Sequence, residues 1–266
     1  MFDELRCGRV VLSKMIQSQA NASINTQESR QEYDRLWSDT WGDLQHYGPV
    51  HRHQREAIVA MVARLGVNSV LDVGCGSGDN LNALAKSLPH LNLSGVDVSP
   101  EALALASQSL QHVRLRELDV QRERLDERFD LVLSIQVIEH LQDDTAALRN
   151  MAAMARRWVL VTTMRGTMRP SERLIGHFRN YSDEELRQKA ECAGLEVVDV
   201  FGWGFPFYSP LYRTVVEWLP TGPPQGSLGP MQRLVASFLY SLYRLNISRH
   251  GDVVTLLARP ALSATH

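Results

Sequence analysis

A glycine-rich loop with an acid in front of it is the first part of the chain whose residue types could do chemistry. Residues 72–78 read Asp-Val-Gly-Cys-Gly-Ser-Gly. Glycine lets the backbone approach a ligand closely. A GxGxxG dinucleotide fingerprint starting at Gly74 would need glycine at position 79, where the chain has Asp79. Asp72, aimed at the loop, would repel a pyrophosphate and attract an ammonium, which favours a nucleoside carrying an amino acid. The alternative is a glycine-rich turn without a ligand.

Two further acids each follow a predicted strand. Asp97 lies 23 residues after Gly74, where a carboxylate can accept hydrogen bonds from two vicinal ribose hydroxyls. Asp119 ends the next strand, and a carboxylate there can accept from the exocyclic amine of adenine. The alternatives are an acid favoured by a helix dipole for Asp97 and a solvated loop acid for Asp119.

Short apolar runs alternate with helical patterns through most of the chain. Such alternation implies βαβ crossovers and therefore an α/β, Rossmann-like, doubly wound sheet that is mostly parallel. Ligands of these sheets bind at the carboxyl ends of the strands, where the glycine loop and the acids fall. The seven predicted strands span residues 69–73, 91–96, 113–118, 129–134, 158–162, 195–200 and 253–258.

The chain divides into three predicted parts. Residues 1–28 form a mobile N-terminal arm, residues 29–205 with 251–262 form the ligand-binding domain, and residues 206–250 form a helical insert between strands six and seven. The insert has two apolar helices around a Pro/Gly turn, at 212–219 and 232–245, and the second carries a broad apolar stripe. It is interpreted either as a hairpin packed on the sheet edge or as a substrate lid, a dimer contact or a membrane-surface contact.

Several of these segments together carry a resemblance to a known family. The chain resembles the class I S-adenosylmethionine-dependent methyltransferases, in the small-molecule branch typified by ubiquinone- and menaquinone-pathway enzymes, over about residues 50–205. The resemblance implies the strand order 3-2-1-4-5-7-6 with strand seven antiparallel. It also implies S-adenosyl-L-methionine as the cofactor and S-adenosyl-L-homocysteine as its product. The residues that carry it are 70–78, 95–99, 119, 129–132 and 137–141.

The resemblance further implies a role for each residue of the cofactor site. Gly74 would offer its carbonyl oxygen to the methionine ammonium, and Asp72 would act through water. Asp97 would hold both ribose hydroxyls, and Asp119 would accept from the adenine amine. Arg52, in the helix before the first strand, matches an arginine that often pairs with the methionine carboxylate. The other implied cofactor-binding residues are Cys75, Gly76, Gly78, Val98, Val120 and Gln136.

Three residues are candidates for catalysis, which needs a general base only when the acceptor must lose a proton. His140 follows the fourth strand, and its ordinary pKa near neutrality suits a base; alternatively it only orders its loop. His177 and Tyr181 lie in a run that resembles a substrate-side loop, or else they pack a helix entry. No metal site is expected, since His51 and His53 have no carboxylate or cysteine at ligand spacing.

Composition and motifs exclude other classes of function. The 28 Lys and Arg against 30 Asp and Glu leave a net charge of -2, without the basic excess of a nucleic-acid binder. Residues 134–137 read Ser-Ile-Gln-Val, unlike the (D/N)PP(Y/F) motif of DNA amino-methyltransferases. No apolar run approaches the roughly 18 residues of a membrane span, and the N-terminus does not read as a signal peptide. We therefore expect a cytoplasmic monomer or homodimer whose partner is a small molecule.

The expected function is transfer of a methyl group from S-adenosylmethionine to a small, apolar or aromatic metabolite by in-line displacement. The alternative is a methyltransferase-fold binding subunit that holds the cofactor without turnover. The intact set of Asp72, Asp97 and the loop glycines favours the enzyme. A nucleotide-dependent oxidoreductase is a third possibility, which Asp72 and Asp79 oppose.

Overall fold

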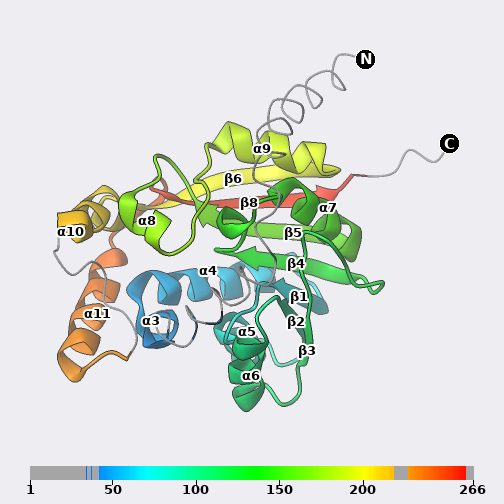
Figure 1. Ribbon diagram of the computed structural model, residues 1–266, viewed down its shortest axis with the longest axis horizontal. Helices are drawn as coiled ribbons and strands as arrows, with labels where there is room; N and C mark the ends of the chain where they lie inside the picture. The colour runs from blue at the N-terminus through cyan, green and yellow to red at the C-terminus, as the bar shows by residue number, and fades with distance from the viewer. Residues whose placement is uncertain (1–33, 35–36, 38–41, 219–226, 262–266) are drawn as a thin grey trace.

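The computed structural model describes residues 34, 37, 42–218 and 227–261, and the predicted arm at 1–28 lies outside them. Its centre is one mixed β-sheet with helices on both faces (Figure 1). The strands are β1 (Ser69–Val73), β2 (Asn92–Asp97), β3 (Arg114–Glu117), β4 (Phe129–Ile135), β5 (Ala155–Met164), β6 (Leu195–Phe205), β7 (Ile247–Arg249) and β8 (Val253–Pro260). The helices are α3 (Gly42–Tyr47), α4 (Pro49–Leu65), α5 (Asp79–Ser87), α6 (Pro100–Ser109), η2 (Ile138–His140), α7 (Asp144–Met154), α8 (Pro170–Leu174), α9 (Asp183–Cys192), η3 (Phe207–Tyr212), α10 (Arg213–Trp218) and α11 (Pro230–Tyr243).

The strand order is β3-β2-β1-β4-β5-β8-β6-β7. The predicted seventh strand is β8, which pairs antiparallel with both β5 and β6. The predicted order of seven strands is therefore confirmed. The short edge strand β7, paired with β6, is additional, because three residues are too few to show a period in the sequence.

Two apolar layers hold the helices against the sheet. On one face, Ile58 of α4 and Leu81 of α5 are buried in a cluster with Val70 and Leu131. On the other face, Leu148 of α7 and Leu186 of α9 are buried against other strand residues. Figure 1 shows α4, α5 and α6 on one side of the sheet and α7 and α9 on the other. This is the doubly wound arrangement that leaves the carboxyl edge of the sheet open for a ligand.

Register brings the predicted site residues to one edge. In the parallel pairs around β1, Val73 lies opposite Val96 of β2 and opposite Ser134 of β4. The segments that follow these three residues therefore leave the sheet side by side. They contain the glycine loop, Asp97 and the turn into η2.

The insert between β6 and β8 forms a small layer of its own. Its helices, α10 and α11, occupy 213–218 and 230–243 in place of the predicted 212–219 and 232–245, and residues 219–226 of the predicted turn lie outside the described chain. Tyr208 and Tyr243 form a separate apolar cluster with Met164 and Val253 at the ends of β5 and β8. The described chain contains no helix of the length and apolarity needed to cross a bilayer.

Candidate active site

The glycine loop is held tightly beside β2 and β4. The backbone N–H groups of Gly74 and Cys75 both donate to the carbonyl oxygen of Val96, at 2.8 and 3.0 Å. Gly74 has φ +73°, and a Cβ there would lie 2.4 Å from Cγ2 of Val137. Both the left-handed backbone and the close approach require glycine at this position.

The described part of the N-terminal segment covers the same loop. A Cβ at Gly76 would lie 2.3 Å from the indole ring of Trp37, so this ring lies directly on the loop backbone. Gly78, with φ +80°, begins α5. His46 of α3 pairs with Asp79 of α5 at 2.9 Å. Trp37 of the N-terminal segment therefore lies on the glycine loop.

Asp72 is the most unusual group at this edge. It is fully buried, and neither carboxylate oxygen has a hydrogen-bond partner among the residues that the structure describes. Burial, reinforced by the nearby Asp97, raises the pKa of Asp72 to about 8. A buried carboxylate without a partner is unfavourable and would gain from a cation. The ammonium of an amino-acid ligand fits this requirement, whereas a pyrophosphate does not.

Asp97 connects the glycine loop to the start of α6. Its Oδ2 accepts from the N–H of Gly76 at 2.8 Å, and its Oδ1 accepts from the N–H of Ser99 at 2.9 Å. Burial raises the pKa of Asp97, while these backbone donors act in the opposite direction. The carboxylate is therefore fixed at the end of β2, where the predicted ribose contact needs it, with half-buried Val98 beside it.

The predicted adenine-side residues lie at the end of β3. Oδ1 of Asp119 accepts from the backbone and side-chain nitrogens of Gln121, at 3.0 and 3.3 Å. Val120 is buried, and its carbonyl oxygen accepts from Asn150 at 2.7 Å. Asp119 is half-buried just beyond the end of β3, and its predicted contact with adenine stays a prediction.

Gln136 follows β4 in a left-handed conformation, with φ +57°. Its N–H donates to the carbonyl oxygen of Thr162 at 2.7 Å, and its buried Nε2 has no partner in the described part of the chain. A non-glycine residue at positive φ costs of order 1–3 kcal/mol and is common at functional sites. The predicted backbone contact of Gln136 with the cofactor stays a prediction.

Arg52 contacts the insert. Its guanidinium carbon is 3.7 Å from the centre of the Tyr240 ring of α11, so this side chain joins α4 to the insert. The predicted pairing of Arg52 with a methionine carboxylate stays a prediction. His51, the preceding residue, is half-buried, and its Nδ1 has no partner among the described residues. Burial and Arg55 lower the pKa of His51 to about 4.

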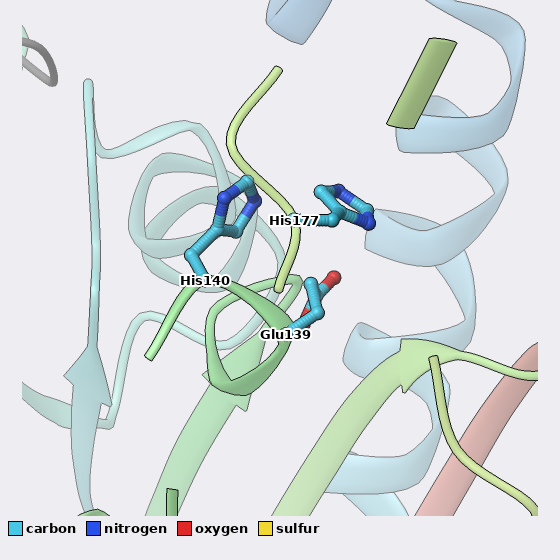
Figure 2. Close-up of side chains that lie close together, drawn as sticks. All are labelled: Glu139, His140 and His177. Carbon is cyan, nitrogen blue, oxygen red and sulfur yellow. The ribbon is translucent and has the colours of Figure 1, made fainter. Parts of the chain in front are cut away.

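Glu139, His140 and His177 come together beyond the end of β4 (Figure 2). One potential ligand atom from each lies within 4.8 Å of the others. Oε2 of Glu139 accepts from the Thr163 hydroxyl at 2.7 Å, while its Oε1 has no partner. Nδ1 of His140 lies 3.3 Å from the Gly176 carbonyl oxygen, and the two imidazole centres are 4.5 Å apart.

Burial sets the charge state of this trio. It raises the pKa of Glu139 to about 7. Burial, with His177 next to it, lowers the pKa of His140 to about 3. Burial also lowers the pKa of His177. Both rings are therefore neutral near pH 7, and the low pKa makes His140 by itself a weak base. The three candidate ligand atoms, all within 4.8 Å of one another, are the only group in the described residues that could hold a metal ion.

The Tyr181 hydroxyl is already hydrogen-bonded within the protein. It is fully buried, and its hydroxyl lies 2.8 Å from Asp144 Oδ2 and 3.0 Å from the Ile138 carbonyl oxygen. Burial raises the pKa of Tyr181. Asp144 also pairs with Lys189 and Arg179, each at 2.7 Å. The buried network assigns Tyr181 a structural role in place of the predicted catalytic one.

A second network, which the sequence did not reveal, holds the His177 loop. Glu172 Oε2 accepts from the Arg169 backbone N–H and from Asn180 Nδ2, at 2.8 and 2.9 Å. The His177 N–H donates to the Glu172 carbonyl oxygen at 3.0 Å. Buried Arg213 of α10 pairs with Glu172 and with Asp252. The insert is therefore fastened to the loop that carries His177.

Comparisons with known proteins agree with this geometry. A family profile described as a methyltransferase domain matches residues 71–157. The release factor glutamine methyltransferase of Geobacter sulfurreducens is 41% identical over 91 residues, covering 32% of each chain. The ubiquinone biosynthesis O-methyltransferase of Nitrosospira multiformis is 25% identical over 213 residues, covering 70% of this chain and 87% of its own.

Among solved structures, the magnesium protoporphyrin IX methyltransferase of Synechocystis with bound S-adenosylhomocysteine superposes with a TM-score of 0.51. It covers 78% of this chain and 82% of its own at 15% identity, a likeness of fold. Matched segments, sheet order and the site at the carboxyl edge agree with one another. The chain therefore contains a methyltransferase domain, matched over residues 71–157, in a Rossmann-like sheet that is similar to those of solved methyltransferases.

Proposed function

We propose that the protein transfers the methyl group of S-adenosylmethionine to a small, apolar or aromatic metabolite by in-line displacement. The observation that carries this proposal is the buried, unpartnered Asp72 beside the glycine loop, because it fits a cationic amino-acid group. The cofactor supplies an already activated methyl group on its sulfonium. Positioning and exclusion of water can therefore account for much of the catalysis.

The residues at the carboxyl edge would divide the binding of the cofactor. Asp72 and the backbone at Gly74 and Gln136 would meet the amino-acid end, Asp97 the ribose, and Asp119 with Val120 the adenine. The bound cofactor would lie against Cys75, Gly76, Gly78 and Val98. Trp37 lies over Gly76, where it would shield this part of the site from water.

Aromatic residues support an apolar or aromatic acceptor. Trp203 stacks on Tyr208 with ring centres 5.9 Å apart, and Tyr243 contacts both rings edge-on, at 6.3 and 5.9 Å. This cluster includes Met164 at the end of β5, and Arg213 ties the insert to the His177 loop. Residues 206–250, proposed as a separate part of the chain, would close over the acceptor.

A proton would leave the acceptor through the histidine pair. His140 and His177 are neutral and adjacent. Because a lowered pKa weakens a base, acceptance of a proton from an O–H, N–H or acidic C–H group would depend on the carboxylate beside them. Glu139 lies next to them and would stabilise the imidazolium once it is ionised. No metal is part of this proposal, and the cytoplasmic location stays a prediction from the sequence.

Methyl transfer from radiolabelled S-adenosylmethionine to a panel of phenols, quinols, carboxylates and amines tests the proposal. We expect transfer to an apolar or aromatic acceptor, and loss of transfer when Asp72 is replaced by Ala. Cofactor binding without transfer to any acceptor class would favour the alternative, a binding subunit without turnover. Transfer only to charged, hydrophilic acceptors would contradict the proposed substrate class.

A further inference from the structure

The short helix α3 contacts both the glycine-loop side of the site and the insert. It lies between α5, which begins at the glycine loop, and α11 (Figure 1). Asp43 is in its first turn and faces α11, and His46 is in its last turn and faces α5. Arg55 of α4 donates to the carbonyl oxygens of Gln45 and His46, each at 2.6 Å, which closes the end of the helix. A helix of six residues is marginal by itself in water, so its position depends on these contacts.

On one side, α3 is joined to the glycine loop through Asp79, the first residue of α5. Nδ1 of His46 lies 2.9 Å from Oδ1 of Asp79. The other oxygen of this carboxylate accepts from the hydroxyl of Ser77, a residue of the loop, at 2.8 Å. Burial opposes the shift, but the hydrogen bonds with His46 and Ser77 lower the pKa of Asp79. The charged carboxylate therefore connects the glycine loop to α3.

On the other side, α3 holds the start of α11. Oδ2 of Asp43 accepts from the backbone N–H of Leu228 at 3.0 Å and from the Arg233 guanidinium at 2.8 Å. The guanidinium carbon of Arg233 also lies 4.4 Å from the centre of the Tyr47 ring, a favourable cation–π contact. Leu228 is buried and directly precedes Gly229, the N-cap residue of α11. Asp43 and Tyr47 thus fix the segment in which α11 begins.

The far end of α11 is attached to a different helix. Nε2 of His53 lies 2.8 Å from the Tyr240 carbonyl oxygen, and the Tyr240 hydroxyl donates to Glu56. Both partners belong to α4. Among the described residues, by contrast, both side-chain hydrogen bonds that reach residues 228–233 from other elements are accepted by Asp43. A shift of α3 would therefore move the start of α11, while its far end stays on α4.

We propose that α3 couples the two sides, so that cofactor bound at the glycine loop orders the start of α11 and with it the insert. A ligand on the loop would fix Ser77 and Asp79, and the contacts of His46 and Asp43 would carry this order to α11. The inference rests on the proposed function, in which the insert closes over the acceptor. Such coupling acts through a contiguous set of contacts and is reciprocal. The acceptor would therefore find its site complete only after the cofactor has bound.

Hydrogen–deuterium exchange of the full-length protein, measured by mass spectrometry with and without saturating S-adenosylhomocysteine, tests this proposal. Two variants remove the contacts of α3, Asp43→Ala on the insert side and His46→Ala on the loop side. The matched control is Asp199→Ala, which removes another partly exposed carboxylate paired with an arginine of the insert, Arg249, at 3.2 Å. Exchange in β4, at the centre of the sheet, reports whether each variant is folded.

In the wild type and in Asp199→Ala, we expect the ligand to slow amide exchange of residues 228–235 at least about fivefold, the lower end of typical coupling between two sites. In Asp43→Ala and His46→Ala, the ligand should still slow exchange in the glycine loop, while residues 228–235 exchange equally with and without it. The coupling is overturned if the ligand slows residues 228–235 in these variants as much as in the wild type. It is also overturned if bound ligand leaves these residues unchanged in the wild type. Failure of the wild type to bind S-adenosylhomocysteine would instead contradict the proposed function on which the coupling rests.

Discussion

The carboxyl edge of the sheet has two halves that are built in different ways. In the cofactor half, backbone groups fix the side chains: Asp97 is held by the N–H groups of Gly76 and Ser99. In the acceptor half, charged side chains from distant segments hold each other, as Glu172, Arg213 and Asp252 do. Because the two halves are held by different interactions, we expect different substitutions to affect cofactor binding and acceptor binding.

Removal of Arg213 should have the largest effect. Its guanidinium is buried between two carboxylates, and breaking such a pair typically costs about 3–5 kcal/mol of stability. We expect Arg213→Ala to lower the free energy of unfolding by that amount in a denaturant titration. Arg249→Ala removes an exposed pair with Asp199 at 3.2 Å and should cost less than about 1 kcal/mol. Equal losses would show that the buried network does not hold the acceptor half.

Replacement of His140 should separate the two halves by function. If His140 accepts the proton of the acceptor, His140→Ala should lower kcat by about 100-fold, a typical general-base effect. The dissociation constant of S-adenosylhomocysteine should remain within a factor of about two. The control is His250→Ala on the exposed surface, which should leave both quantities unchanged. A variant that loses cofactor affinity in parallel with rate would contradict the separation.

A methyl group at Gly74 should damage the cofactor half. The Cβ of Gly74→Ala would meet Val137 at 2.4 Å in a left-handed backbone, at a combined cost of about 2–4 kcal/mol. We expect S-adenosylhomocysteine binding, measured by calorimetry, to weaken at least about tenfold. Gly66→Ala is the matched control, because φ there is +58° and nothing lies within 4 Å of the new Cβ. Unimpaired binding by Gly74→Ala would show that the loop does not contact the cofactor.

Asp97→Ala should weaken cofactor binding by about 1–3 kcal/mol, through loss of hydrogen bonds to a charged group. The same calorimetric titration measures the effect. Asp97→Asn keeps one acceptor oxygen and should fall between the wild type and Asp97→Ala. An unchanged dissociation constant in both variants would mean that a different residue binds the ribose.

Asp72 should make stability depend on pH. Its pKa is raised to about 8 in the folded protein, so the folded state holds a proton that the unfolded state has already lost. This contribution to stability is full below the unfolded pKa of about 4, falls as the pH rises toward the folded pKa, and no longer changes above it. Between pH 7 and 8 we expect the cofactor-free protein to lose about 1 kcal/mol. Asp72→Asn should remove this part of the slope in thermal unfolding. If the pH dependence of stability persists in the variant, another group, such as Glu139, causes it.

The sequence was sufficient to place the glycine loop, Asp97 and Asp119 at one edge of the sheet, and insufficient for the contacts around His177, for a physical reason. The glycine loop, Asp97 and Asp119 each follow a strand directly, so sheet topology alone brings them to one edge. His177 and Glu139 meet only because α8 and its loop fold over the end of β4, and no local period encodes that contact. Arg213 pairs with Glu172, which lies 41 residues earlier in the chain. Arg52 contacts Tyr240 of α11, a helix outside the predicted ligand-binding domain.

The central claim is that this edge of the sheet binds S-adenosylmethionine through Asp72, the glycine loop and Asp97. Calorimetric titration of the wild-type chain with S-adenosylhomocysteine, and in parallel with NAD, tests it most directly. We predict one S-adenosylhomocysteine site per chain that is lost in Gly74→Ala, and no measurable NAD binding. Tighter binding of NAD, or no binding of S-adenosylhomocysteine by the wild-type chain, would contradict the claim.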